Sequence, residues 1–294
     1  MSEPLEIADP ATARGMSWRR IARRWNIIVP GIVLVVLGII ALMPAPFAAI
    51  FGNGDPRACE LGRSLESPGP GHPFGLDVQG CDVYANVIYG TRTSLAVGLL
   101  STAIALVLAL VLGTLGGLAG RVVDWVVSRI TEIFLGFPFL LGAIVVLSAV
   151  GERSVLSVSL VLALFGWPTM ARLMRASVRS IRSSEYVLAA VTMGIPYRRI
   201  VLRYIMPNAI QPVLVIATLS VGAVIVAEST LTYLGIGLEA PAISWGLQLS
   251  SASSKFQLAP HLLLFPGLFL AVTVLAITTL GDALRSALDP RRQQ

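Results

Sequence analysis

The stretch TSLAVGLLSTAIALVLALVLGTLGGLAG, residues 93–120, decides the fold class, because 28 consecutive residues carry no charge. About 20 apolar residues are enough to cross the hydrocarbon core of a bilayer as a helix. Five more stretches with few or no charges occur at 27–51, 133–151, 154–171, 204–227 and 256–281. We therefore predict an all-α, polytopic membrane protein with six transmembrane helices.

The composition supports this class, since hydrophobic residues make up 55% of the chain and charged residues only 13%, against about 25% charged in soluble domains. Mean hydropathy is +0.79. We expect the third helix to begin near Val122, and the fourth to be interrupted by Pro168. Breaks in backbone hydrogen bonding are expected at Pro138, Pro168, Pro212 and Pro266, as kinks or beside a water-lined path.

The placement of arginine predicts the orientation, because loops that stay in the cytoplasm retain positive charge. If the N-terminus is inside, 17 of the 22 basic residues are cytoplasmic. The exceptions are Arg57, Arg63, Arg92, Arg153 and Lys255. Both termini are then cytoplasmic, and the long loop after the first helix lies outside. The first apolar run is too long for a signal peptide, and the net charge of +6 requires no nucleic acid.

The only two cysteines, Cys59 and Cys81, lie in that extracytoplasmic loop. An oxidising compartment permits a disulfide, which would close a loop of roughly 22 residues and contribute about 3 kcal/mol. Free thiols are the alternative that the sequence leaves open. Metal binding by these cysteines and His72 is disfavoured by their spacing and by the small number of ligands.

Motifs of enzyme active sites are missing from the sequence. A Walker A phosphate loop needs a lysine after its last glycine, but the only lysine, Lys255, follows Ser254. His72 and His261 are too far apart for a two-histidine zinc helix. We expect no catalytic residue, no cofactor-binding residue and no metal site in this chain.

Glu228 is the one acidic residue well inside a predicted span. Ionisable groups at such depth are costly and often functional. A proton relay is one interpretation, which would suit an ion-coupled carrier. We favour a gate or helix-packing residue that hydrogen bonds between helices.

Seven arginines and Glu185 distinguish the segment at 172–207, RLMRASVRSIRSSEYVLAAVTMGIPYRRIVLRYIMP. Its first four arginines share one helical face, which favours anchoring to lipid phosphates. A short helix is then predicted from Ser183 or Ser184 as N-cap to Gly194 as stop. Its apolar face would be costly in water, so it either packs under the bundle or inserts into a cytoplasmic partner's cleft. We favour the partner.

The same segment resembles the EAA loop of ATP-binding-cassette importer permeases. Ala189, Ala190, Gly194 and Pro207 match that pattern, whereas Leu188 replaces the usual glutamate and Met206 the usual leucine. The resemblance implies a coupling helix that sits in a groove of an ATPase subunit. The residues it assigns to ATPase coupling are Glu185, Tyr186, Leu188, Ala189, Ala190, Gly194 and Pro207.

Other phrases resemble the C-type permease of dipeptide and oligopeptide importers. They include HPFGLDVQGCDVYANVIYGTRTSL, GFPFLL, WPTMARLMR, ESTLTYLGIGLEAP, SWG and LGDALRSALDP, in the expected order. Leu76, Cys81 and Asn86 depart from the pattern, replacing threonine and two arginines. Glycines at 113, 116, 117 and 120 form small-xxx-small pairs, which predict close packing of another helix.

The resemblance implies a type I importer permease in a bacterial cell membrane. Residues 1–92 would hold the N-terminal tail, first helix and outer loop, and residues 93–294 the permease core with the coupling loop 172–207. The implied partners are a B-type permease, two cytoplasmic ATPases carrying ATP and Mg²⁺, and a binding protein that delivers peptide. Relatives handle nickel chelates, haem or glutathione, and an ion-coupled carrier is the remaining alternative class.

Overall fold

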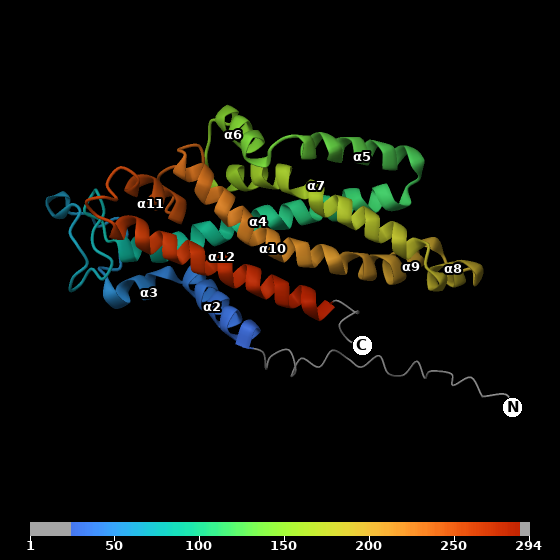
Figure 1. Cartoon of the computed structure of the whole chain (residues 1–294), viewed down its shortest axis with the longest axis horizontal. Coiled ribbons are helices and arrows are strands. Elements are labelled where there is room, and N and C mark those ends of the chain that lie inside the picture. The colour runs from blue at the N-terminus through green and yellow to red at the C-terminus, as the bar shows by residue number, and fades with distance from the viewer. Residues whose placement is uncertain (1–24, 289–294) are drawn as a thin grey trace.

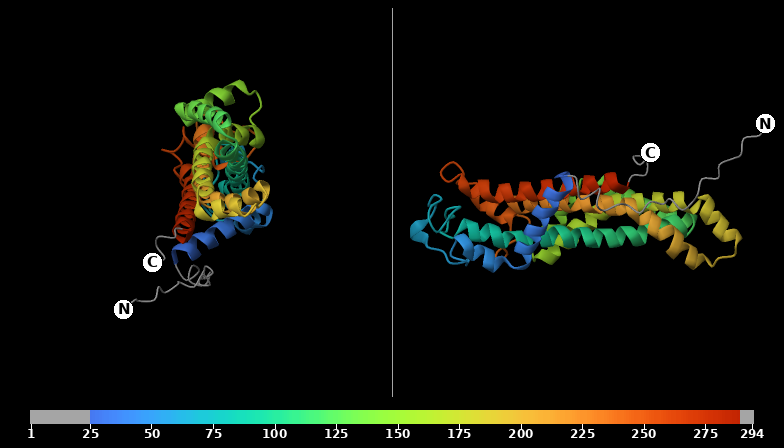
Figure 2. Two further views of the ribbon diagram at one scale, coloured as in Figure 1. Left: turned by 90° about the vertical axis from the view of Figure 1, so that its right-hand side faces the viewer. Right: turned by 90° about the horizontal axis from the view of Figure 1, so that it is seen from below.

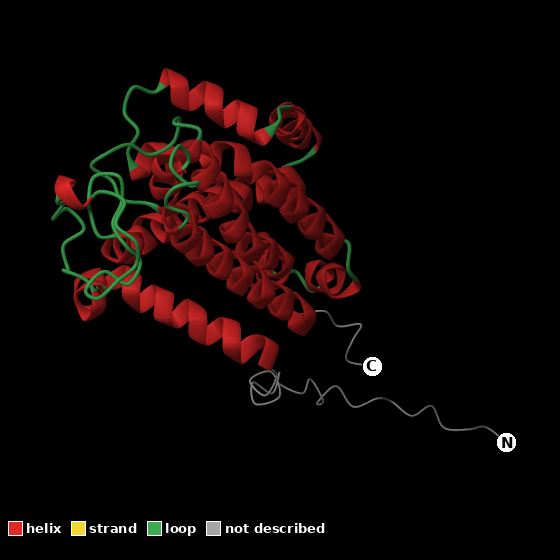
Figure 3. Cartoon of the chain, turned by 60° about the vertical axis from the view of Figure 1, so that its left-hand side comes forward, coloured by secondary structure: helices red, strands yellow, loops and turns green. Residues whose placement is uncertain are grey.

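The computed structural model describes residues 25–288, which form an elongated bundle of helices with no named strand among them (Figures 1 and 3). The terminal arginines, before residue 25 and after residue 288, were predicted to be cytoplasmic, and they lie outside the described residues. The helices, in chain order, are α2 (Trp25–Leu42), α3 (Pro44–Phe51), η2 (Leu61–Arg63), α4 (Val83–Leu118), α5 (Arg121–Gly136), α6 (Phe139–Ala149), α7 (Val155–Arg182), α8 (Glu185–Thr192), α9 (Tyr197–Ile200), the π-helical η3 (Val201–Ile205), α10 (Met206–Tyr233), α11 (Trp245–Ala252) and α12 (His261–Leu288).

Four helical segments are long and apolar enough to span a membrane: α4, α7, the continuous run from α9 through α10, and α12. Two bent pairs, α2 with α3 and α5 with α6, bring the number to six if each pair counts as one span. The predicted all-α membrane class is confirmed. The four long spans run along one axis, with α8 and α9 at one end and the loop between α3 and α4 at the other (Figures 1 and 2).

The predicted first and third spans are not single straight helices. The first bends by 98° between α2 and α3, and the third by 89° between α5 and α6. Proline explains both breaks, because it disfavours helical backbone at the preceding residue. Pro44 opens α3 after Met43, and Pro138 precedes α6 after Phe137.

The helix expected to be interrupted at Pro168 is continuous there, and Pro212 and Pro266 also lie inside continuous helices, although each proline lacks the backbone N–H of a helical bond. Neighbouring helices compensate for a lost backbone bond in such positions. The helices also extend beyond their apolar cores: α4 begins ten residues before position 93, and α7 continues past 171 to Arg182. Charged ends of this kind can project beyond the hydrocarbon core.

Close packing of α4 against α7 forms the centre of the bundle, as the glycine pattern predicts. A Cβ atom at Gly113 would lie 2.6 Å from Cβ of Met174, and one at Gly117 would lie 2.5 Å from Cγ1 of Val178. Only glycine permits this backbone approach without a shift. Gly120 does not take part in the helix contact, because it ends the turn before α5 with a φ of +94°.

Candidate coupling site and its supporting core

The candidate coupling segment is mostly helical, rather than a loop. Residues 172–182 complete α7, α8 follows after two residues, and α9 continues through η3 into α10. The N-cap of α8 is Ser184, although its hydroxyl donates to the carbonyl of Ile181 and does not accept an N–H from the helix. The short helix therefore occurs where the sequence predicts it.

The end of α8 depends on Gly194. Its amide donates to the carbonyl of Val191, and the amide of Ile195 donates to that of Ala190, which is the Schellman arrangement. Gly194 has a φ of +72°, a left-handed conformation that glycine adopts without strain. A Cβ there would meet nothing within 4 Å. The backbone conformation, and not a close approach within this chain, requires the glycine.

The two faces of α8 have different surroundings. Val187 and Ala190 are buried in one hydrophobic cluster with Met174 and Val178 of α7 and with Ile205 of η3. The opposite face is open, and its exposed apolar side chains are Tyr186, Leu188, Val191 and Met193. Glu185 and Ala189 are exposed as well. Of the two alanines in the EAA pattern, only Ala189 is available to a partner, because Ala190 is part of the core.

Pro207 lies at the start of α10, inside the long helical run and not at a loop boundary. A proline has no N–H and its ring crowds the carbonyl of an earlier turn, so the ladder must adjust. The π-helical η3 ends at Ile205, two residues before Pro207, where such an adjustment is expected. Such π segments are frequent at functional sites.

The arginines of α7 do not all face lipid, contrary to expectation. Arg175 and Arg179 both pair with Asp124 of α5. The spacing of the arginines along one helical face could not reveal this contact, because Asp124 lies about fifty residues earlier in the chain. Arg172 and Arg182 are exposed and make no ion pair among residues 25–288.

Glu228 is completely buried in α10. Its carboxylate accepts hydrogen bonds from the hydroxyls of Ser229 and Thr232, and the Thr232 hydroxyl in turn accepts the amide N–H of Leu238 in the following loop. The site lies against α11, since a Cβ at Gly246 would be 2.9 Å from Cα of Ser229. Both of these hydroxyl donors belong to α10, so the expected hydrogen bond between helices is not among these contacts, and the gate or packing role of Glu228 stays a prediction.

The Gly-x-Arg-x-Ser motif lies in the first turns of α4 and contacts α11. The amide of Trp245 donates to the Ser94 hydroxyl at 3.2 Å, and its indole N–H donates to the carbonyl of Val87 at 3.1 Å. A Cβ at Gly90 would lie 3.1 Å from the Trp245 ring. The Gly-x-Arg-x-Ser pattern and the later SWG phrase therefore describe the two sides of one contact.

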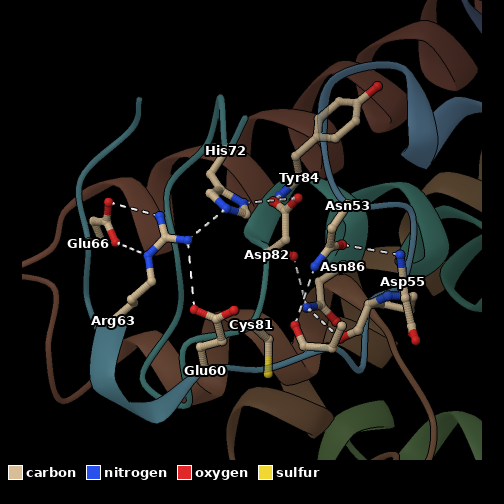
Figure 4. Close-up of polar contacts among 12 residues, drawn as sticks. Asn53, Asp55, Glu60, Arg63, Glu66, His72, Cys81, Asp82, Tyr84 and Asn86 are labelled. Carbon is tan, nitrogen blue, oxygen red and sulfur yellow. Dashed lines mark hydrogen bonds and ion pairs between the residues drawn. The ribbon is translucent and has the colours of Figure 1, made fainter. Parts of the chain in front are cut away.

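The loop between α3 and α4 is a packed cap (Figure 4). Cys59 and Cys81 form a disulfide, and Arg63 donates to the Glu66 carboxylate at 2.6 Å. This hydrogen bond lowers the pKa of the Glu66 carboxyl below its ordinary value. His72 lies 3.5 Å from Asp82, whose carboxylate accepts the N–H of Tyr84 at the start of α4.

The three departures from the permease pattern all have contacts in this cap. Cys81 forms the disulfide, Leu76 is buried, and the Asn86 amide donates to the carbonyls of Pro56 and Asp82. Farther out, Arg57 donates to the carbonyl of Pro241 at 3.1 Å. The cap is thereby tied to the loop between α10 and α11.

No group of three His, Cys, Asp or Glu side chains in the described part of the chain could hold a metal ion. The fold and its polar cap instead define a polytopic helical membrane component, with an exposed apolar surface at one end. The chain belongs to the binding-protein-dependent transport system inner membrane components, because the model of that family matches residues 105–294. It is therefore a multi-pass inner membrane protein.

Similar proteins cover nearly the whole chain. It is 35% identical to the dipeptide transport system permease protein DppC of Alkalihalophilus pseudofirmus, over 88% of this chain and 86% of that one. It is 31% identical to the oligopeptide transport system permease protein OppC of Bacillus subtilis, over 98% of both. It is 32% identical to the glutathione transport system permease protein GsiD of Pectobacterium atrosepticum, over 93% of this chain and 90% of that one.

The fold matches the MetNI methionine ABC transporter in an inward-facing conformation, with a TM-score of 0.57. The match covers 69% of this chain and 97% of the other, at 19% identity. A crystal structure of an amino acid ABC transporter with histidines gives a TM-score of 0.53. The expected importer permease fold is confirmed.

Proposed function

We propose that this chain is one of two permease subunits of an ATP-driven peptide importer. It would pair with a related B-type subunit, each forming half of the translocation pathway. Two cytoplasmic ATPases carrying ATP and Mg²⁺, and an extracytoplasmic binding protein, complete the proposed assembly. Support for peptide cargo comes from relatives named for dipeptides and oligopeptides over most of their length.

The observation that carries the coupling role is the two-sided environment of α8. Its inner face, Val187 and Ala190, belongs to the cluster that also contains α4, α7 and α10. Its outer face is apolar and exposed. A partner that moves α8 must therefore move or strain the spanning helices. ATP can drive this change because nucleotide binding favours one arrangement of the assembly over another.

The proposed pathway runs beside a pocket of about 350 Å³ between α4, α6, α7 and α10. It is lined by apolar side chains and by hydroxyls from Ser101, Thr102, Ser220 and Thr230. The hydroxyls of Ser101 and Thr102 are buried without a hydrogen-bond partner among residues 25–288. Such groups could bind peptide N–H and C=O groups during passage, and thereby repay their own desolvation.

The proposed orientation places α8 in the cytoplasm, the cap at 52–82 outside, and both termini inside. The cap would form part of the surface on which the binding protein docks. A reporter that is active only in the cytoplasm should work when fused after Arg182 and fail near Glu66. Activity at Glu66 would overturn the orientation.

Cysteine cross-linking tests the coupling assignment. In the assembled importer, Leu188→Cys should cross-link to a cysteine in the cleft of the ATPase, because Leu188 is 53% exposed on the outer face of α8. The matched control is Leu258→Cys, which is 78% exposed near the other end of the bundle and should give no such product. Equal cross-linking of both variants, or of neither, would refute the contact.

Uptake into vesicles tests the cargo. The reconstituted importer with its binding protein should transport labelled dipeptides or oligopeptides across the vesicle membrane. It should do so only when ATP is supplied on the side of the membrane that carries the ATPase subunits. Glutathione is the competing cargo, because one relative is named for it, and nickel chelates or haem would be tried next. Uptake driven by an ion gradient without ATP would indicate a carrier instead.

A further inference from the structure

A groove of about 540 Å³ opens where the end of α4, the start of α5, the end of α7 and α8 meet. Its walls include Arg121, Arg179, Arg182 and Leu188, and glycines at 116, 117 and 120 leave its α4 side without side chains. We propose that this groove binds the phosphate headgroup of an anionic phospholipid.

The charge balance favours an anion. Asp124 is the only acidic residue that lines the groove, and it already pairs with Arg175 and Arg179. Arg121 and Arg182 are exposed and form no ion pair within the described chain. Arg121 is also the first residue of α5, a 16-residue helix whose N-terminal dipole adds further positive potential.

The depth of the groove favours a lipid as the source of that phosphate. It lies at the boundary where the charge-free span of α4 ends, at Leu118. Trp125, four residues after Arg121 on α5, is 61% exposed, and Val122 is 76% exposed. Exposed tryptophan marks the headgroup level of a membrane, so acyl chains can lie along this surface while the headgroup reaches the arginines.

Basic pockets between helices on the cytoplasmic side of membranes bind anionic headgroups. The groove has a further consequence, because Leu188 of α8 forms one of its walls. A bound headgroup would contact the same helix that we assign to ATPase coupling. The lipid would thereby stabilise one position of α8, and anionic lipid should change the rate of ATP hydrolysis by the complete importer.

The test counts bound lipids on the assembled importer by native mass spectrometry, after incubation with equal amounts of phosphatidylglycerol and phosphatidylcholine. The wild type should retain phosphatidylglycerol preferentially. Arg121→Gln with Arg182→Gln should weaken that retention by roughly 25-fold, about fivefold for each arginine. Lysine at both positions should restore most of it, because lysine also carries a positive charge.

Arg172→Gln is the matched control, since Arg172 is an exposed arginine on the same helix that does not line the groove. Its retention of phosphatidylglycerol should equal that of the wild type. In nanodiscs, added phosphatidylglycerol should alter ATPase activity of the wild type and the control, but not of the double glutamine variant. This readout does not depend on which cargo the importer carries.

Two results would overturn the proposal. One is equal retention of phosphatidylglycerol by the wild type and the double glutamine variant. The other is loss of the ATPase subunits from the double variant with lipid retention unchanged, which would mean that the arginines bind a carboxylate of the ATPase.

Discussion

Asp124 on α5 holds the guanidinium of Arg175 on α7, although the two residues are separated by 51 positions in the chain. The same carboxylate also pairs with Arg179. Both oxygens of Asp124 are therefore used to fasten α5, the first half of a bent span, to the central helix that leads into α8. This contact joins the edge of the bundle to the candidate coupling site.

We expect Asp124→Asn to destabilise the protein by about 1–2 kcal/mol, between the values for exposed and for buried pairs. The pair is only partly exposed, with side-chain exposures of 17% for Asp124 and 24% for Arg175. The measurement is the thermal unfolding midpoint in detergent. Glu132→Gln is the control, because its pair with Arg129 is more than half exposed on both sides. Equal effects of the two substitutions would contradict this account.

The disulfide between Cys59 and Cys81 should protect both thiols. Under denaturing, non-reducing conditions a maleimide should label neither cysteine, and after reduction it should label both. We expect Cys81→Ser to lower the stability of the cap by about 3 kcal/mol, from the entropy of closing this loop. Proteolysis of the outer loop in intact vesicles measures that loss. Complete labelling before reduction would exclude the bridge.

Glu228 offers a direct choice between a structural and a proton-carrying role. Glu228→Gln should keep peptide uptake near the wild-type level, because the amide oxygen can still accept from the Thr232 hydroxyl while the amide NH2 can donate to the Ser229 hydroxyl oxygen. Glu228→Ala should destabilise the protein by about 1–3 kcal/mol, because it leaves buried hydroxyls without their acceptor. Uptake and unfolding are measured in parallel. A correctly folded glutamine variant with no uptake would indicate a proton role.

Asp77, in the cap between α3 and α4, should make the stability of the protein depend on pH. Burial raises the pKa of its carboxyl above the ordinary value of 3.8, despite hydrogen bonds from the backbone amides of Gln79 and Cys81. A raised pKa in the folded state contributes stability at low pH, which is lost as pH rises through that value. We expect Asp77→Asn to gain stability relative to the wild type as pH increases from 3.8 toward neutral.

Thermal unfolding across that pH range measures the difference between the two proteins. Glu66→Gln is the opposite control, because the hydrogen bond from Arg63 lowers the pKa of Glu66. The stabilisation that ionised Glu66 gives the wild type is present at neutral pH and is lost on acidification. A difference between wild type and Asp77→Asn that does not change with pH would rule out this effect of burial.

The sequence predicts the membrane class, the number of hydrophobic segments and the short helix at 185–192, because each depends on composition or on local signals. It predicts the break at Pro138 but not the bend at Pro44, and it does not distinguish the prolines that bend a span from those that do not. Prolines at 44 and 138 coincide with breaks, whereas those at 168, 212 and 266 do not. The difference lies in whether neighbouring helices satisfy the freed backbone groups, which is a property of the tertiary structure.

The sequence pattern also does not predict which side chains at the candidate site are buried or paired. Ala189 and Ala190 occupy adjacent positions in the motif, yet Ala190 is buried in the core and Ala189 is exposed. Arg175 pairs with Asp124 while Arg172 on the same helix does not. Both outcomes depend on which helices lie next to α7 and α8, and a single sequence does not specify those neighbours.

Gly194 provides the sharpest test of the coupling role. Its φ of +72° strains any residue with a branched side chain, yet a Cβ there would meet nothing within 4 Å in this chain. Gly194→Val should therefore disturb only the end of α8, leaving the spans inserted. We expect ATP hydrolysis to continue while peptide uptake falls at least tenfold, because α8 no longer holds its position.

Gly194→Asn is the matched variant, because asparagine tolerates left-handed backbone better than other residues. It should retain most of the uptake of the wild type. Ala190→Trp would be a poorer probe, because Ala190 is buried and a larger side chain there would disrupt the core. Uptake and ATP hydrolysis would be measured in reconstituted vesicles, with co-purification of the ATPase confirming assembly. If the valine variant assembles and transports normally, α8 is only a membrane-surface anchor.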